Sequence, residues 1–93
     1  MNLSQFQAEL QAGQYSDAVP VQREVGYQLD GHQHSFDACA LITAGEITLV
    51  IEGVASRYSV GDVFRLPAGT VHLESVGPDG VSYLSGRRES PAP

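Results

Sequence analysis

The chain has 93 residues, a hydrophobic content of 42% and a formal net charge of −6. This length predicts a single domain, and the hydrophobic content is too high for an intrinsically disordered chain. Because nucleic acids and anionic membranes are bound through clusters of Lys and Arg, the acidic balance argues against both as the main partner.

Several features bear on location. No apolar run approaches the ~20 residues that cross a membrane. The first residues, Met1 to Ser4, have neither the basic nor the apolar region of a signal peptide. The single cysteine excludes an internal disulfide. We therefore expect a cytoplasmic protein.

The first segment, residues 1–17, has a helical pattern. Apolar residues at positions 3, 6 and 10 repeat at helical spacing. Ser4 followed by Gln7 fits a capping box, and Gly13 fits a C-terminal stop. We expect one short helix that packs on the rest of the domain or on a partner.

From residue 18 onward the chain changes to short β-type runs separated by turn residues. Such runs, at regular spacing with Gly and Pro between them, predict an all-β sandwich or barrel over residues 18–88. Residues 89–93 lack any core signal, so we expect a frayed tail. The predicted strands are 19–25, 38–43, 46–52, 55–60, 63–66, 72–76 and 81–84, with turns at 30–31, 44–45, 52–53, 61–62, 67–69 and 77–80.

All three histidines lie in two short motifs, His32-Gln33-His34 and Pro67-Ala68-Gly69-Thr70-Val71-His72. In a β-strand, residues i and i+2 face the same side, so His32 and His34 can point both imidazoles into one cavity. The turn at 67–69 would deliver His72 from a distant segment. Three neutral imidazoles suit a divalent transition metal, and three ligands leave an open position for water or substrate.

These motifs resemble those of the cupin superfamily. The first cupin motif is Gly, five residues, His-x-His, three or four residues, Glu, and six residues to a Gly. The second is Gly, five residues, Pro-x-Gly, two residues, His, three residues, Asn. In this chain Gly26 has the required spacing to His32 and His34, and Gly61 has it to Pro67 and His72.

The resemblance implies a double-stranded β-helix, or jelly-roll, barrel of the small single-domain cupin-2 (RmlC-like) type. It also implies that His32, His34 and His72 hold one divalent ion, which could be Fe, Mn, Ni, Cu or Zn. It implies no single reaction, because cupins include dioxygenases, isomerases, decarboxylases, storage proteins and sensor domains.

Two positions depart from the cupin pattern. Counted with four residues after His34, Cys39 occupies the glutamate position and Gly45 comes one residue early, while Val76 occupies the asparagine position. Cys39 has three interpretations: a buried apolar residue, a thiolate ligand in place of the glutamate, or a redox-sensitive thiol.

Two carboxylates are candidates for the missing ligand or for a catalytic group. Asp37 precedes Cys39 by two residues; it could reach the site, hydrogen-bond a ligating imidazole or cap a turn. Glu74 follows His72 by two residues, so on a regular strand it would share the histidine's face as a ligand or general base. The alternative for Glu74 is a solvent-facing edge residue.

The expected pocket lining is Phe36, Leu41, Phe64 and Tyr58, with Arg57 or Arg65 near the mouth. We expect a mononuclear, dioxygenase-like oxygenase or an isomerase-like enzyme acting on a small organic molecule. The alternative is a non-catalytic metal or small-ligand sensor or accessory module. An enzyme should have a pocket of ~300 Å³ or more, whereas a sensor could have a filled cavity. We also expect a homodimer through residues 1–17 and strand 19–25, because edge strands need covering.

Overall fold

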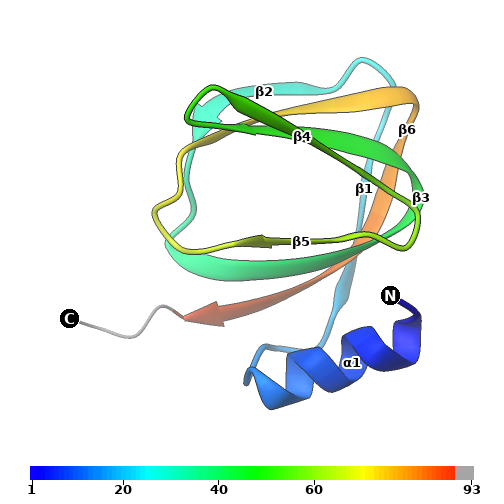
Figure 1. The fold of residues 1–93 in the computed structure, drawn as a ribbon, viewed down its shortest axis with the longest axis vertical. Helices are drawn as coiled ribbons and strands as arrows, with labels where there is room; N and C mark the ends of the chain where they lie inside the picture. Colours follow the sequence, from blue (N-terminus) through cyan, green and yellow to red (C-terminus); the bar gives the residue numbers. More distant parts are fainter. Residues whose placement is uncertain (90–93) are drawn as a thin grey trace.

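The computed structural model of the protein describes residues 1–89. It consists of one helix, α1 (Leu3–Ala12), followed by six strands (Figure 1). Most of the predicted tail, residues 90–93, lies outside the described residues, while Glu89 ends the last strand. The strands are β1 (Val19–Arg23), β2 (Gln28–His32), β3 (Phe36–Ile51), β4 (Val54–Ser59), β5 (Val63–Leu66) and β6 (His72–Glu89).

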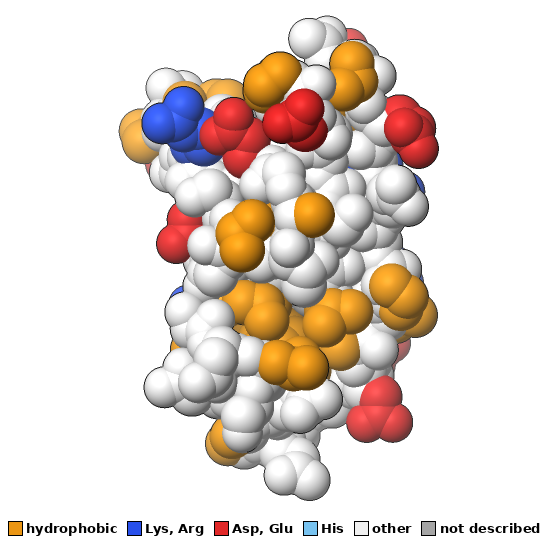
Figure 2. All heavy atoms as spheres, turned by 90° about the vertical axis from the view of Figure 1, so that its right-hand side faces the viewer, with side chains coloured by type: hydrophobic (Ala, Val, Ile, Leu, Met, Phe, Trp, Pro, Cys, Tyr) orange, Lys and Arg blue, Asp and Glu red, His pale blue; other side chains and the backbone are white. Residues whose placement is uncertain are grey.

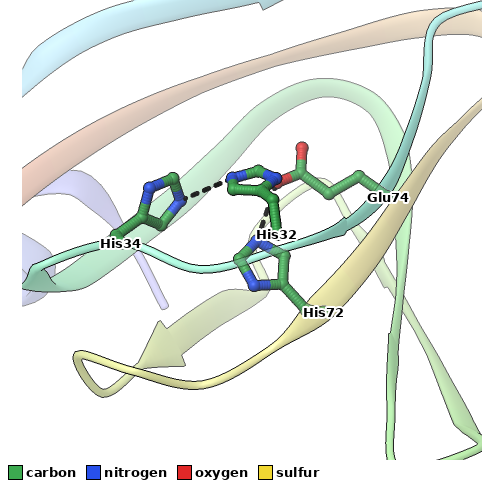
Figure 3. A group of neighbouring side chains, drawn as sticks. All are labelled: His32, His34, His72 and Glu74. Carbon is green, nitrogen blue, oxygen red and sulfur yellow. Dashed lines mark hydrogen bonds and ion pairs between the residues drawn. The ribbon is translucent and has the colours of Figure 1, made fainter.

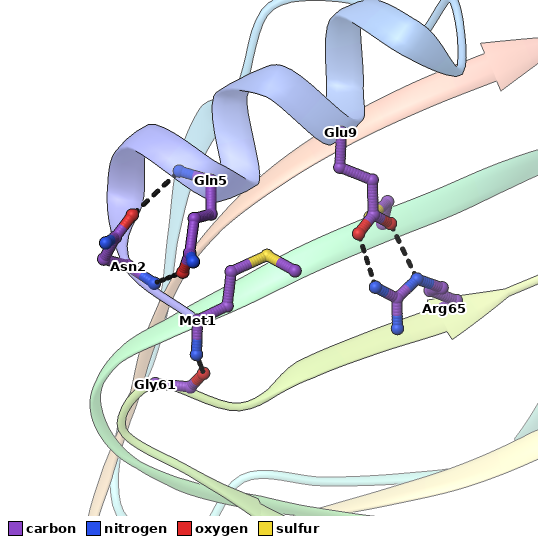
Figure 4. A network of polar contacts seen from close by, with 7 residues as sticks. Met1, Asn2, Gln5, Glu9, Gly61 and Arg65 are labelled. Carbon is purple, nitrogen blue, oxygen red and sulfur yellow. Dashed lines mark hydrogen bonds and ion pairs between the residues drawn. The ribbon is translucent and has the colours of Figure 1, made fainter.

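The N-cap of α1 lies two residues earlier than the predicted cap, Ser4. Asn2 is the N-cap: its Oδ1 accepts from the Gln5 backbone N–H at 2.8 Å, and the Gln5 side chain accepts from the Asn2 N–H at 3.0 Å (Figure 4). The predicted Ser4–Gln7 capping box was therefore wrong, because Ser4 already lies in the first helical turn. Gly13 is the C-cap, as predicted. No helix of residues 1–89 is long and apolar enough to cross a membrane.

The strands form two facing sheets that share β3 and β6 (Figure 1). These two strands pair antiparallel from Phe36↔Glu89 to Val50↔Leu73. The first sheet contains β1, the end of β6, the start of β3, and β5. The second contains β2, the start of β6, the end of β3, and β4. This is the predicted jelly-roll barrel.

The predicted turns at 44–45 and 77–80 are bends within the continuous strands β3 and β6. The strand register of β3 against β6 shifts on both sides of Gly45. Gly45 and Gly80 have φ values of +69° and +72°, a region that residues with a Cβ rarely adopt. A Cβ on Gly45 would overlap the backbone carbonyl of Gly80. The two strands therefore pass from one sheet to the other together, with glycine at the point of closest approach.

Side chains of β3 alternate between two hydrophobic clusters. Ala38, Ala40 and Ile42 face the space between the sheets, where they pack with residues of β5 and β6. Cys39 and Leu41 face outward, where they pack against α1. The helix thus covers the outer face of the first sheet and contributes the fully buried Phe6 to the second cluster.

Polar contacts also hold α1 on the barrel (Figure 4). The Glu9 carboxylate accepts two hydrogen bonds from the Arg65 guanidinium on β5, one of them at 2.7 Å. The N-terminal amine of Met1 donates to the carbonyl of Gly61 at 2.7 Å. Of the two predicted docking positions for the helix, the structure shows the one on its own barrel.

Candidate metal centre

Four side chains from separate parts of the barrel point into one space (Figure 3). His32 ends β2, His34 follows it in the loop, and His72 and Glu74 come from the start of β6. One ligand atom from each of these four residues lies within 4.8 Å of the others. The pairing of β2 with β6 places His32 directly opposite His72, with ring centroids 4.6 Å apart.

His34 reaches the cluster from a loop and not from the expected strand. Its backbone carbonyl accepts a hydrogen bond from the Gly69 N–H at 2.9 Å, so the turn before His72 also anchors the loop that carries His34. The Phe36 ring stacks on the His34 ring at 4.8 Å and 20°. These contacts bring His34 Nε2 within 3.3 Å of His32 Nε2.

Hydrogen bonding defines the orientation of His72, whose side chain is fully buried. Its Nδ1 lies 2.9 Å from the Thr70 carbonyl oxygen, which can only accept, so Nδ1 carries a proton. Nε2 is then the nitrogen that points into the cluster, 3.0 Å from Glu74 Oε2; a proton between these two atoms makes the contact a hydrogen bond, and a divalent ion would take the place of that proton. This is the arrangement in which a backbone carbonyl fixes the tautomer of a metal-ligating histidine.

The environment favours the neutral form of His34. Burial lowers the pKa of His34, and the neighbouring His72 and His32 lower it further. A metal ligand must present an unprotonated nitrogen, so a lowered pKa makes the ring ready to bind at neutral pH. The Glu74 side chain, only 9% exposed, supplies one negative charge to balance a divalent ion.

Two observations indicate that the three imidazoles and one carboxylate of this cluster suit a divalent metal. Within residues 1–89, His32 Nδ1 is the one buried side-chain nitrogen or oxygen without a hydrogen-bond partner, and a cation bound at this nitrogen would supply one. Ligand atoms ~2.1 Å from one ion lie at most ~4.2 Å apart. The observed limit of 4.8 Å therefore requires a movement of less than an ångström.

A cavity of about 220 Å³ lies next to the cluster, between the two sheets. It is smaller than the ~300 Å³ expected of an ordinary ligand site, so any ligand must be small. Burial raises the pKa of Tyr83 on its wall to about 12, with Glu74 contributing in the same direction, so the phenol stays protonated. Of the cluster, His32, His34 and Glu74 line the cavity; the other lining residues are Val21, Arg23, Tyr27, Leu29, Phe36, Ala38, Phe64, Leu66, Tyr83, Ser85 and Arg87.

Two of the four expected pocket residues line this cavity, and two do not. Phe36 and Phe64 lie on its wall. Leu41 was wrongly placed, because it faces outward on β3 and packs under α1. Tyr58 does not line the cavity; it packs against the core, with its ring centroid 5.7 Å from that of Phe64. Sequence reasoning missed Arg23 and Arg87, because nothing local to either residue indicates a shared cavity.

The structure also separates Cys39 and Asp37 from the cluster, because both are on the outward face of β3. The buried Cys39 thiol donates to Glu9 at 3.3 Å, and burial raises its pKa to about 12. It is therefore neither a thiolate ligand nor a reactive thiol. Asp37 accepts from the Ala68 N–H at 2.8 Å and from Arg88, and these two contacts lower its pKa. It holds the turn that leads to His72.

The alternation of β3 also identifies the residue at the cupin glutamate position. Counted with three residues after His34, that position is Ala38, which faces the cavity. The motif glycine then falls on Gly45 without any offset. Counting four residues, which gave Cys39, was wrong. Ala38 has no ligand atom, and Glu74 on the neighbouring strand β6 is the carboxylate present in the cluster.

The groove between α1 and the barrel, about 650 Å³ in volume, is larger than the cavity but contains no histidine or cysteine. Its apolar lining includes Leu3, Leu10 and Leu84. Figure 2 shows the right-hand side of the view in Figure 1, where hydrophobic side chains gather at the level at which the helix meets the barrel. The groove is separate from the cluster of His32, His34, His72 and Glu74.

Comparison with known proteins identifies the fold. No protein-family model and no curated protein matches the sequence. A cupin superfamily protein from Desulfitobacterium hafniense matches with a TM-score of 0.66 and 18% identity, over 76% of this chain and 64% of its own. KdgF from Halomonas sp. matches with a TM-score of 0.63 and 28% identity, over 78% of this chain and 69% of its own. The DMSP lyase DddQ from Ruegeria pomeroyi matches with a TM-score of 0.70 and 27% identity, over 84% of this chain and 42% of its own. This chain therefore spans less than two thirds of the first and the third of these proteins. It is a small cupin-like domain.

Proposed function

We propose that this domain binds one divalent transition metal through His32, His34 and His72, with Glu74 as the fourth ligand. The observation that carries this proposal is the convergence of three imidazoles and one carboxylate on a single space between the sheets. The tautomer of His72 supports it, because the Thr70 carbonyl leaves Nε2 free to bind. Fe, Mn, Ni, Cu and Zn all suit imidazole-rich sites, so the identity of the ion is a matter for measurement.

We propose further that the carboxylate ligand has moved between strands. Cupins place a glutamate on the strand that follows His-x-His, where this chain has Ala38. Glu74 lies on β6, two residues from His72, and its carboxylate is already within hydrogen-bond distance of that ring. A carboxylate delivered from β6 restores three nitrogens and one oxygen around the ion.

The proposed activity is that of a small oxygenase or isomerase-like enzyme acting on a small organic molecule. When bound, the metal would polarise a substrate oxygen or activate water or O₂. The protein holds the ligands, limits the substrate to the size of the cavity and keeps the Tyr83 hydroxyl protonated as a hydrogen-bond donor. That a DMSP lyase shares this fold is consistent with a catalytic role, although this chain spans 42% of that enzyme.

Metal content of the untagged protein tests the proposal. We expect about one ion per chain, lost in the His32→Ala/His34→Ala double variant. Glu74→Gln should weaken binding at least ~10-fold, since even partners that only orient a ligand contribute ~10–100-fold. Cys39→Ser, on the outward face of β3, is the matched control outside the cluster and should retain the metal. Equal metal content in the double variant and the wild type would refute the site.

A rescue experiment tests the exchange of the carboxylate between strands. Ala38 lines the cavity, so a glutamate placed there can reach the same space. Adding Ala38→Glu to Glu74→Gln should recover part of the lost metal affinity. No recovery in a variant that folds normally by circular dichroism would count against the equivalence of the two positions.

A non-catalytic metal or small-ligand sensor, or an accessory module, is the second candidate. The small volume of the cavity, about 220 Å³, favours it, as does the exposed apolar groove along α1. Turnover would decide between the candidates, because a sensor binds its ligand without converting it.

We also propose that the domain is a cytoplasmic homodimer. Strand β1 pairs only with β6 among the described strands, so its other edge is open for a second chain, and Val19 on it is 53% exposed. Light scattering during gel filtration tests this assembly, and a monomer at micromolar concentration would contradict it.

A further inference from the structure

The five basic side chains of this protein are all arginines, and they fall into two groups. Three of them lie outside the cavity, and each forms an ion pair with a carboxylate. Within residues 1–89, Arg23 and Arg87 form no ion pair, and both line the cavity. The three pairs are Arg57 with Glu46, Arg65 with Glu9, and Arg88 with Asp37.

This distribution makes the cavity positive in an acidic protein. Its walls carry two guanidinium groups, Arg23 and Arg87, and one carboxylate, Glu74, so with neutral histidines their net charge is +1. The whole chain has a net charge of −6. A bound divalent ion would raise the local charge further. An anion is therefore attracted to this place on a protein that otherwise repels it.

Side chains alternate between the two faces of each strand, and this alternation points Arg23 and Arg87 toward the cavity. Tyr83, Ser85 and Arg87 follow one another at every second residue of β6, and all three face the cavity. The Arg87 guanidinium lies 4.3 Å above the Phe36 ring, which in turn stacks on His34. This contact holds the charge beside the metal ligands while leaving its N–H groups free to donate.

Arg23 enters from the neighbouring strand β1. It shares the inward face with Val21, and its guanidinium lies 5.2 Å from the centre of the Tyr27 ring. In the strand register Arg23 is opposite Val81, whereas Arg87 is further along β6, so the two charges stand at different parts of the cavity wall.

We propose that the ligand of this cavity is a small organic carboxylate, with Arg87 as the group that pairs with its carboxylate and Arg23 as a second source of positive potential. A guanidinium matches the planar carboxylate with two parallel N–H donors. The apolar wall, which includes Leu29, Phe64 and Leu66, suits a short hydrocarbon part. This inference rests on the proposed function in naming the ligand class of the same site.

The size of the cavity limits this ligand. At ~30 Å³ for each water in the liquid, a volume of about 220 Å³ holds roughly seven water-sized groups. Butyrate, with its short chain and single carboxylate, is a suitable probe. Butyramide has the same shape without the charge, and inorganic phosphate has the charge without the chain.

We would titrate these three probes into the isotope-labelled full chain, both metal-free and loaded with Zn²⁺, and follow the backbone amides of Tyr83 and Ser85 by NMR. Butyrate should bind more tightly than butyramide and phosphate. Arg87→Gln should weaken butyrate binding ~10-fold and Arg23→Gln by less, because the loss of a charged hydrogen-bond partner has an effect of this order. Arg87→Lys should retain part of the affinity. Arg57→Gln, on the outer surface, is the matched control and should change nothing.

The outcomes separate this inference from the metal proposal. Arginine-dependent butyrate binding in a protein that takes up no metal would support the carboxylate site and refute the metal centre. Equal affinity for butyrate and butyramide would overturn the inference. So would butyrate binding that needs Zn²⁺ but is insensitive to both arginine substitutions, because the metal alone would then hold the carboxylate. Binding of phosphate without butyrate would overturn it as well.

Discussion

The substitution Gly45→Ala tests the bend that brings the two sheets together around the candidate site. Gly45 has φ +69° and pairs with Val81, and a Cβ there would overlap the Gly80 carbonyl and lie 3.1 Å from Val81 Cα. Both obstacles are backbone atoms of a paired strand, so neither can move without breaking the β3–β6 ladder. Gly53 is a matched control, since its φ is +78° and a Cβ added to it would meet no other atom within 4 Å.

The magnitude follows from two contributions. A left-handed conformation costs an L-residue ~1–2 kcal/mol, partly offset by the ~0.4–1 kcal/mol gained because alanine restricts the unfolded chain. Gly53→Ala should therefore lower the free energy of unfolding by ~1 kcal/mol. Gly45→Ala adds steric overlap of ~1–3 kcal/mol, for a total of ~3 kcal/mol. That is a large part of the ~5 kcal/mol expected at the lower limit for a domain of this size.

Urea denaturation measures the free energy of unfolding of both variants. Circular dichroism follows the transition, because the chain has no tryptophan for fluorescence. A loss of ~3 kcal/mol corresponds to a fall in Tm of roughly 15 °C, against ~5 °C for the control. Equal destabilisation by the two substitutions would refute the steric argument and leave only the backbone conformation as the cause. A Gly45→Ala protein as stable as the wild type would show that β3 does not bend at this residue.

Three further predictions concern α1 and the face of β3 beneath it. Leu41→Ala should lower the free energy of unfolding by ~2–3 kcal/mol, measured by urea denaturation, without changing metal content, because Leu41 packs under the helix and not in the cavity. Cys39 should not react with a thiol reagent at neutral pH until the protein is unfolded, since it is fully buried and its pKa is raised to about 12; rapid labelling of the native protein would contradict its position. Glu9→Gln should lower stability by less than ~1 kcal/mol at neutral pH, because the ion pair with Arg65 is partly exposed. The Arg65 hydrogen bond lowers the pKa of Glu9, so this contribution is present above the ordinary carboxyl pKa and disappears as the pH falls through the lowered value; a difference from wild type that persists below it would have another cause.

Local sequence patterns were enough to predict the fold and the three histidines. The spacing of Phe6 and Leu10 predicted a helix, and alternating β-type runs predicted an all-β sandwich or barrel, because each pattern depends only on the period of one element. The resemblance to cupins then selected the jelly-roll barrel. The two motifs placed His32, His34 and His72 together, since glycine and proline turns have restricted geometries that fix where the next residue points. Glu74 was a candidate by the same two-residue rule that applies to any strand.

The tertiary structure decided which face of each strand looks inward and which distant residues share the cavity. Whether β3 presents Ala38 or Cys39 to the site depends on its register with β6, and a shift by one residue exchanges the two faces. Gly45 looks like a turn when read alone, but its partner Val81 keeps the strand continuous through the bend. Arg23 and Arg87 line one cavity, at different parts of its wall, because β1 pairs with β6, a contact between segments far apart in the chain. Pairing between distant strands is a property of the whole fold, and no local pattern in the sequence encodes it.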